Sequence, residues 1–225
     1  PSFGVSVLPD SCRCNLGDYA GNIDFVSVRE DSGAGLLSDA GIDARVVVDP
    51  TLLLFAEDYD LAASRPNWLP KRYLVVYKFG NRSEYDRLIK STAKRLGLDV
   101  VNIPAGLDSP LKTRWDIGPA EFLSLIRDAE LVCTDSFHAT VFSTVYRTPC
   151  LVFPRDEPGS KQSMNSRMEG LLCRLGMKTR YAPTPASWDD ALTAELDYDE
   201  AHRRLAEWRA DSEAFLQEAL DGIDA

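Results

Sequence analysis

The chain has 225 residues, 44% of them apolar and 27% charged, which is an ordinary globular composition and excludes collagen-like repeats and wholesale disorder. No run of about 18 apolar residues occurs, so the sequence predicts no membrane-spanning helix. The net charge of −10 is concentrated in residues 189–225, which hold 12 acidic residues and three arginines, and the rest of the chain is nearly neutral. The basic face of a nucleic-acid-binding protein is not visible.

The first part of the chain predicts a short α/β series. Residues 25–28 and 46–48 have the pattern of strands, and residues 32–40 between them predict a helix that ends at Gly41. Residues 57–70 contain two prolines and predict an irregular linker.

A second and fuller series follows. Strands are predicted at 73–77, 100–103, 131–134 and 150–153. Helices are predicted from an N-cap at Ser83 to Gly97, from Pro119 to about residue 126, at 139–146 and at 167–175. Strands and helices that alternate at this spacing predict βαβ units and a parallel sheet. Residues 199–220 predict a final amphipathic helix with its acidic face in solvent.

These series give a predicted domain organisation. Residues 1–60 supply too few strands for a complete sheet, so we expect them to be the C-terminal part of a first Rossmann-like lobe. Residues 61–70 are the expected linker, 71–182 a second Rossmann-like lobe, and 183–225 a C-terminal linker with the acidic helix. The first ten residues lack the segments of a signal peptide, and we expect the sequence to begin partway through a longer protein.

The five cysteines indicate a reducing compartment, because their number is odd and two of them lie in apolar runs. Cys133 and Cys150 are therefore expected to be buried thiols. Cys12 and Cys14 have no partner pair at a suitable spacing, so we expect no metal site.

Candidate site residues gather where strands are expected to end. In an open parallel sheet, ligands bind beyond the carboxyl ends of the strands, at helix N-termini. Thr134, Asp135, Ser136 and Phe137 lead from a strand into a helix whose first turn contains His138. A catalytic role and a purely structural role for this histidine are about equally favoured by its position. The other histidine, His202, is expected on the surface of the last helix.

Two further segments carry basic residues at such ends. Arg29 follows the strand at 25–28, where its guanidinium suits a carboxylate or phosphate, although spacing alone favours an ion pair with Glu30 or Asp31. The loop before the helix at 167–175 contains three polar or basic candidates. These are Lys161, Asn165 and Arg167. Such a loop is either functional or a solvated, capped loop.

Several short stretches, taken in order, resemble the polysaccharide pyruvyl transferase family. They are SVRE at 27–30 with SG at 32–33, VDPTLL at 48–53, CTDSFHATVFS at 133–143, and NSR at 165–167 followed by LL and LG. The resemblance extends from Ser2 to about Arg180. It implies that the family's N-terminal portion is absent from this sequence.

The resemblance implies an α/β fold of GT-B type, with two Rossmann-like lobes, parallel sheets and the site in the cleft between the lobes, the first lobe being only partly present. It implies transfer of a pyruvyl group from phosphoenolpyruvate to two hydroxyls of a sugar as a cyclic ketal. His138 and Arg29 then carry over as catalytic residues. The donor-binding residues would be Thr134, Asp135, Ser136, Phe137, Lys161, Asn165 and Arg167. Many family members have an arginine where Ser136 stands.

The expected partners are phosphoenolpyruvate as donor substrate and a sugar or lipid-linked oligosaccharide as acceptor, with no cofactor and no nucleic acid. The expected location is cytoplasmic, peripheral to the inner membrane face. Two other functions stay open: a nucleotide-sugar-dependent glycosyltransferase of the same shape, and a non-catalytic saccharide-binding domain.

Overall fold

A four-stranded parallel sheet organises the larger part of the chain in the computed structural model, which describes residues 3, 7–105, 111, 114–157, 160 and 163–223. Its strand order is β4-β3-β5-β6. The strands are β3 (Tyr73–Tyr77), β4 (Asp99–Ile103), β5 (Leu131–Thr134) and β6 (Cys150–Val152). Tyr77 is in register with both Ile103 and Thr134, so three strands end at one level. The sheet therefore presents a common carboxyl edge.

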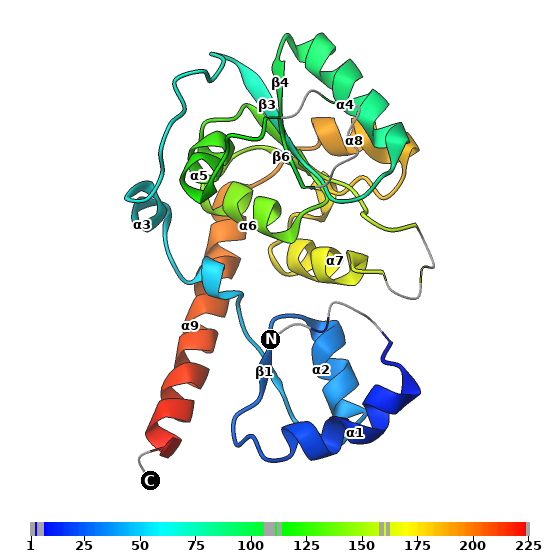
Figure 1. Cartoon of the computed structure of the whole chain (residues 1–225). Helices are drawn as coiled ribbons and strands as arrows, with labels where there is room; N and C mark the ends of the chain where they lie inside the picture. Colours follow the sequence, from blue (N-terminus) through cyan, green and yellow to red (C-terminus); the bar gives the residue numbers. More distant parts are fainter. Residues whose placement is uncertain are drawn as a thin grey trace.

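Helices cover both faces of this sheet because successive residues of a buried strand point to opposite sides. Val75 of β3 belongs to a core shared with α5 (Pro119–Arg127) and α6 (Phe137–Val145). Its neighbour Val76 belongs to a second core with α4 (Ser83–Leu96) and α8 (Trp188–Thr193). Figure 1 shows these two helix pairs on opposite sides of the strands. Short 3-10 turns at η2 (Lys178–Arg180) and η3 (Pro185–Ser187) connect α7 (Asn165–Arg174) to α8.

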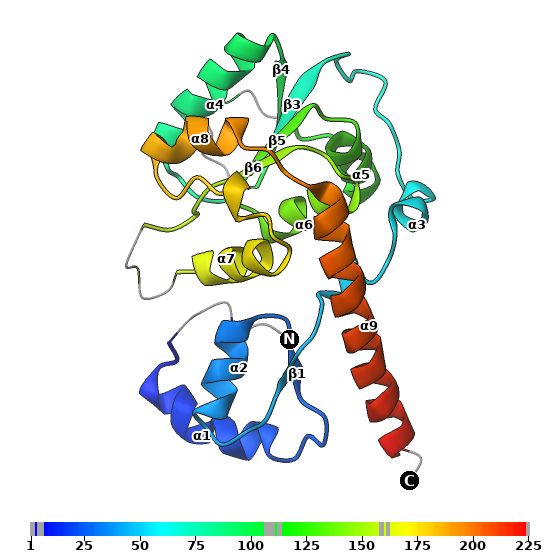
Figure 2. The ribbon, with the colours of Figure 1, turned by 180° about the vertical axis from the view of Figure 1, so that it is seen from behind.

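A smaller group of elements from the start of the chain lies below α7 (Figures 1 and 2). It contains α1 (Asp10–Ala20), α2 (Asp31–Ser38) and a two-stranded parallel sheet of β1 (Ser27–Val28) and β2 (Arg45–Val46). Val28 and Leu37 form its apolar centre with Ala20. An ion pair of 2.5 Å between Asp31 of α2 and Arg174 of α7 joins it to the larger sheet's helices. The chain then continues through η1 (Pro50–Leu52) and α3 (Ala56–Asp60).

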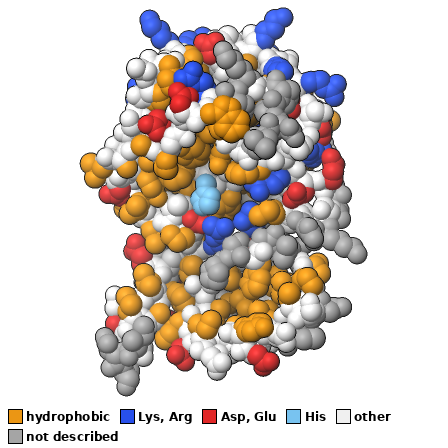
Figure 3. Space-filling view, viewed as in Figure 1, with side chains coloured by type: hydrophobic (Ala, Val, Ile, Leu, Met, Phe, Trp, Pro, Cys, Tyr) orange, Lys and Arg blue, Asp and Glu red, His pale blue; other side chains and the backbone are white. Residues whose placement is uncertain are grey.

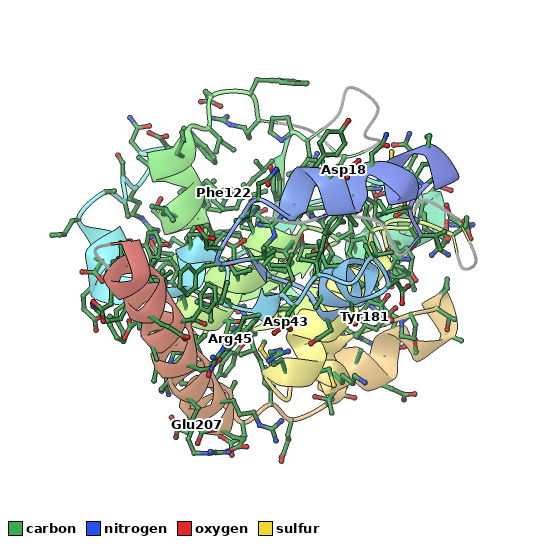
Figure 4. The ribbon with its side chains drawn as sticks, turned by 90° about the horizontal axis from the view of Figure 1, so that it is seen from below. Asp18, Asp43, Arg45, Phe122, Tyr181 and Glu207 are labelled. Atoms are coloured by element: carbon green, nitrogen blue, oxygen red, sulfur yellow. The ribbon has the colours of Figure 1, made fainter. Side chains whose placement is uncertain are left out.

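The last helix, α9 (Tyr198–Ile223), runs beside both groups (Figure 2). Its first half buries Ala201 and Leu205 in the core of the larger sheet. Its second half reaches the segment that follows β2, where the Ser212 hydroxyl accepts a hydrogen bond of 3.0 Å from the Val48 amide. Asp211 also pairs with Arg45, which Figure 4 labels beside this helix. No helix within the described ranges is both long and apolar enough to cross a membrane.

Most predicted elements of the second series are confirmed, with shifts of one to three residues at their ends. Ser83 is the first residue of α4 rather than its N-cap, which is Arg82. Residues 57–70 are not wholly irregular, because α3 covers residues 56–60. His202 is not a plain surface residue: it is half-buried, and its Nε2 lies 2.8 Å from the Thr144 carbonyl oxygen. The predicted domain boundaries and the two-lobed arrangement stay predictions.

Candidate active site

The turn from β5 into α6 is built by short-range hydrogen bonds. The Thr134 hydroxyl donates to the Tyr77 carbonyl oxygen and accepts from the Ser136 amide at 2.9 Å. Ser136 is the N-cap of α6, and its hydroxyl accepts from the Ala139 amide at 3.4 Å. These bonds direct the N-terminus of α6 toward the common carboxyl edge of the sheet, where its dipole favours an anion. His138 is the second residue of this helix, as the sequence predicts.

Asp135 fixes the loop that follows β3. Its buried carboxylate accepts hydrogen bonds of 2.8 Å from the amides of Phe79 and Gly80. Burial raises the pKa of Asp135, against the effect of these hydrogen bonds. A Cβ at Gly80 would lie 2.6 Å from the Arg155 carbonyl oxygen, so only glycine allows this approach. Asp135, a predicted donor-binding residue, thus has its carboxylate engaged within the chain.

Asn165 has a similar role in the loop between β6 and α7. Its side-chain oxygen accepts from the Arg155 amide at 3.0 Å, and its side-chain nitrogen donates to the Asp156 carbonyl oxygen at 3.0 Å. This pairing holds the loop that carries Arg155. Lys161, the other predicted residue of this loop, lies outside the described residues.

Asp49 connects Arg29 to His138. Its carboxylate is 2% exposed, pairs with Arg29 and lies 3.9 Å from His138 Nε2. Thr51 donates two hydrogen bonds to it, from its amide at 3.0 Å and its hydroxyl at 2.6 Å. Burial raises the pKa of Asp49, but the hydrogen bonds from Thr51 and Arg29 outweigh that effect, and the pKa is lowered. Asp49 is therefore an anion held between an imidazole and a guanidinium.

This arrangement corrects the ion pair expected within the segment that contains Arg29. Arg29 pairs with Asp49, 20 residues along the chain, and Asp31 pairs with Arg174. The correction has a simple cause: β1 and β2 pair in parallel, so Arg29 and Asp49, which follow the two strands, lie at the same end of this sheet.

Three arginines form a cationic group that we call the arginine cluster: Arg29, Arg155 and Arg167. The guanidinium carbons of Arg29 and Arg167 lie 5.0 and 6.0 Å from the centre of the Phe137 ring. Each of the three arginines has a buried Nε–H without a hydrogen-bond partner in the described part of the chain. Burial and the charge of Arg29 lower the pKa of Arg167. Unpaired buried donors on like-charged groups make this cluster a candidate site for an anion.

His138 is half-exposed, and its surroundings favour the neutral imidazole. Burial lowers its pKa, the cations Arg29 and Arg167 lower it further, and Asp49 opposes them. A neutral imidazole at physiological pH is able to accept a proton from a hydroxyl.

A cavity of about 370 Å³ lies beside His138, and none of its described lining residues belongs to the arginine cluster. Its walls include the rings of Tyr77, Phe79 and Phe122, the last of which comes from α5 (Figure 4). On the face shown in Figure 3, hydrophobic side chains gather on one side of a histidine and basic side chains on the other.

The structure thus brings together His138, Arg29, Phe137 and Arg167 from the predicted set. Thr134, Asp135 and Asn165 shape the surrounding loops, and Ser136 caps α6. Asp49 and Arg155 were absent from the prediction. Asp49 lies within the VDPTLL stretch, and this was its only signal in the sequence. The described residues contain no group of three or more His, Cys, Asp or Glu side chains placed to hold a metal ion.

Comparisons with known proteins place the chain in a family. No curated protein matches it. Among solved structures, it is similar to the crystal structure of the glycotransferase of kitacinnamycin, with 17% identity, a TM-score of 0.39, and coverage of 97% of this chain and 67% of that one. The family model described as polysaccharide pyruvyl transferase matches residues 1–157, more than half of the chain. The chain therefore belongs to the polysaccharide pyruvyl transferase family.

Proposed function

We propose that this protein transfers the pyruvyl group of phosphoenolpyruvate to two hydroxyls of a sugar and forms a pyruvate ketal. The observation that carries the proposal is the convergence of His138, Asp49 and the arginine cluster at the N-terminus of α6. Membership of the family supports transferase activity in general.

The arginine cluster is the proposed donor site. Phosphoenolpyruvate carries a phosphate and a carboxylate, and guanidinium groups bind both anions with paired hydrogen bonds. The buried Nε–H groups of Arg29, Arg155 and Arg167 support this role, because an anion would supply the acceptors that they lack. These arginines would also supply the charge that an arginine at position 136 would otherwise bring.

In the proposed reaction, two sugar oxygens become bonded to one carbon of the donor. The first sugar oxygen bonds to C2 of phosphoenolpyruvate while the methylene carbon takes a proton and becomes a methyl group. The second sugar oxygen then displaces the phosphate from C2. One hydroxyl proton ends on the methyl group, and the other leaves with inorganic phosphate. Neutral His138 would accept the hydroxyl proton and pass it on, and Asp49 would stabilise the imidazolium formed between these steps.

The proposed setting of this reaction is the assembly of a surface or capsular polysaccharide. The acceptor would be a sugar or lipid-linked oligosaccharide on the cytoplasmic side, with the protein peripheral to the inner membrane face. We further propose the two-lobed GT-B arrangement with the site between the lobes, and a reaction that needs no cofactor besides the donor.

Thermal unfolding with candidate donors tests the proposal. At a hundredfold excess over its Kd, phosphoenolpyruvate should stabilise the full chain by ~2.7 kcal/mol, and the Tm should rise accordingly. Arg167→Gln should abolish this shift. The matched control is Arg65→Gln. This change removes a half-exposed guanidinium that pairs with Asp128 and is not a member of the arginine cluster, so the Tm shift should be kept.

Other results would contradict the proposal. Stabilisation by UDP- or GDP-sugars instead of phosphoenolpyruvate would favour a glycosyltransferase. A protein that responds to no donor even when the expected N-terminal portion of the first lobe is restored would favour a non-catalytic saccharide-binding domain.

A further inference from the structure

The cavity beside His138 differs in chemistry from the arginine cluster. Its volume of about 370 Å³ falls within the range of small-molecule sites, about 300–1,000 Å³. Tyr77, Phe79, Ile103, Phe122, Ser136 and His138 all line it. None of its described lining residues is an arginine, lysine or carboxylate, whereas every member of the arginine cluster is a cation.

An aromatic wall forms one side of this cavity. The Tyr77 ring makes edge-to-face contacts with Phe79 and Phe122, at centroid distances of 5.0 and 5.2 Å. Ser136 and His138 are the polar residues besides Tyr77 among its described lining residues. Phe79 is 42% exposed, which is high for a large aromatic side chain that contacts other rings. Its ring is held in place, because the Arg155 guanidinium lies 4.4 Å over it.

We propose that this cavity is the acceptor subsite, where a pyranose ring rests against Tyr77, Phe79 and Phe122 with a hydroxyl directed to His138. This inference rests on the proposed function. A pyranose has an apolar face of C–H groups and a rim of hydroxyls, which matches a cavity lined by both aromatic and polar residues. No described lining residue of the cavity carries a positive charge that would bind phosphoenolpyruvate.

The placement also fits the reaction. His138 lines the cavity and lies 3.9 Å from Asp49, which pairs with Arg29 of the cluster, so it lies between the two halves of the site. An acceptor hydroxyl in the cavity and C2 of phosphoenolpyruvate at the arginine cluster would then both lie close to the His138 imidazole. Arg155, itself a member of the arginine cluster, stacks on Phe79 of the cavity and so connects the two halves.

The test compares two phenylalanines that are both half-exposed and both stacked with an arginine, of which only Phe79 lines the cavity. Phe79→Ala removes a half-exposed ring under Arg155, and Phe55→Ala removes a half-exposed ring 4.4 Å from the Arg209 guanidinium, away from the cavity. The binding of methyl hexopyranosides to the full chain, saturated with phosphoenolpyruvate, is measured by saturation-transfer NMR and calorimetry. The Kd of phosphoenolpyruvate is measured in each variant.

We expect Phe79→Ala to weaken pyranoside binding by roughly five- to tenfold, the effect of losing one stacked ring. Phe79→Trp should restore binding, and Phe55→Ala should leave it unchanged. Phe79→Trp and Phe55→Ala should change the Kd of phosphoenolpyruvate less than twofold, because both keep a ring beneath the Arg155 guanidinium, and this separates the inference from the donor proposal. Phe79→Ala removes that ring, so pyranoside binding to it is compared at saturating donor.

Three results would overturn the inference. Pyranosides that bind Phe79→Ala as tightly as the unaltered chain, with donor binding intact, would refute the subsite and leave the proposed function standing. Binding of no pyranoside at all would also refute it. Uridine monophosphate that competes for the cavity and loses affinity in Phe79→Ala would identify a nucleobase pocket instead.

Discussion

His138 and Asp49 are the polar centre of the site, and the surroundings of each side chain fix its charge. The pKa of Asp49 is lowered by its hydrogen bonds, so it stays an anion at neutral pH. The pKa of His138 is lowered by burial and by two cations, so the neutral imidazole persists to lower pH than in an ordinary histidine. A buried anion beside a neutral base is the arrangement that a proton acceptor needs.

His138→Gln should lower kcat about 10²–10⁴-fold, the usual contribution of a general base, and leave the Kd of phosphoenolpyruvate unchanged. His202→Gln is the matched control, because His202 contacts the Thr144 carbonyl oxygen away from the site. It should keep kcat and lower only the Tm. Full activity in His138→Gln would remove the imidazole from the mechanism.

The pKa of His138 is directly measurable, because the chain has only two histidines. An NMR titration of the imidazole protons should give His138 a pKa below 6.5. Arg29→Gln removes a nearby cation and a partner of Asp49, so it should raise that pKa. A value at or above 6.5 in the unaltered chain would contradict the described environment.

At the scale of elements, hydrogen bonds hold the β3–α4 loop against the β5–α6 turn. Asp135 accepts from both Phe79 and Gly80, and the Arg155 carbonyl oxygen approaches Gly80 closely. The elements themselves follow from local sequence: β3 is continuously apolar, and α4 ends at Gly97 in the left-handed conformation, as predicted. These contacts between the loop and the turn could not be predicted, because they join positions more than 50 residues apart.

Gly80→Ala should therefore destabilise the fold by about 1–3 kcal/mol through overpacking. Gly35→Ala is the control, because nothing lies within 4 Å of a Cβ at that helical position. It should stabilise the chain by about 0.5–1 kcal/mol. Urea unfolding measures both changes, and equal midpoints for the two variants would refute the close approach.

At the scale of the whole molecule, α9 joins the core of the larger sheet to the segment that follows β2. Arg209 donates to the carbonyl oxygens of Leu52 and Leu54, and Ser212 accepts from the Val48 amide. The parallel α/β series was predictable because strand and helix periodicity are local properties. The pairing of Asp49 with Arg29 and His138 was not, because it depends on how distant segments pack, and periodicity carries no such information.

Ser212→Ala should leave the buried Val48 amide without an acceptor and cost about 1–3 kcal/mol. Hydrogen exchange should become faster in the peptide that contains Val48 and Asp49. Gln217→Ala, at an exposed position of the same helix, should change neither quantity. Unchanged exchange in Ser212→Ala would show that α9 does not hold this segment.

The attachment of α9 to the segment around Asp49 has a consequence for biosynthesis. The ribosome makes Arg29, Asp49 and His138 well before residues 209–212, so the emerging polypeptide holds these residues of the candidate site before α9 can bind the segment around Asp49. We therefore expect the candidate site to take its final form only after α9, which contributes no side chain to it, has been made.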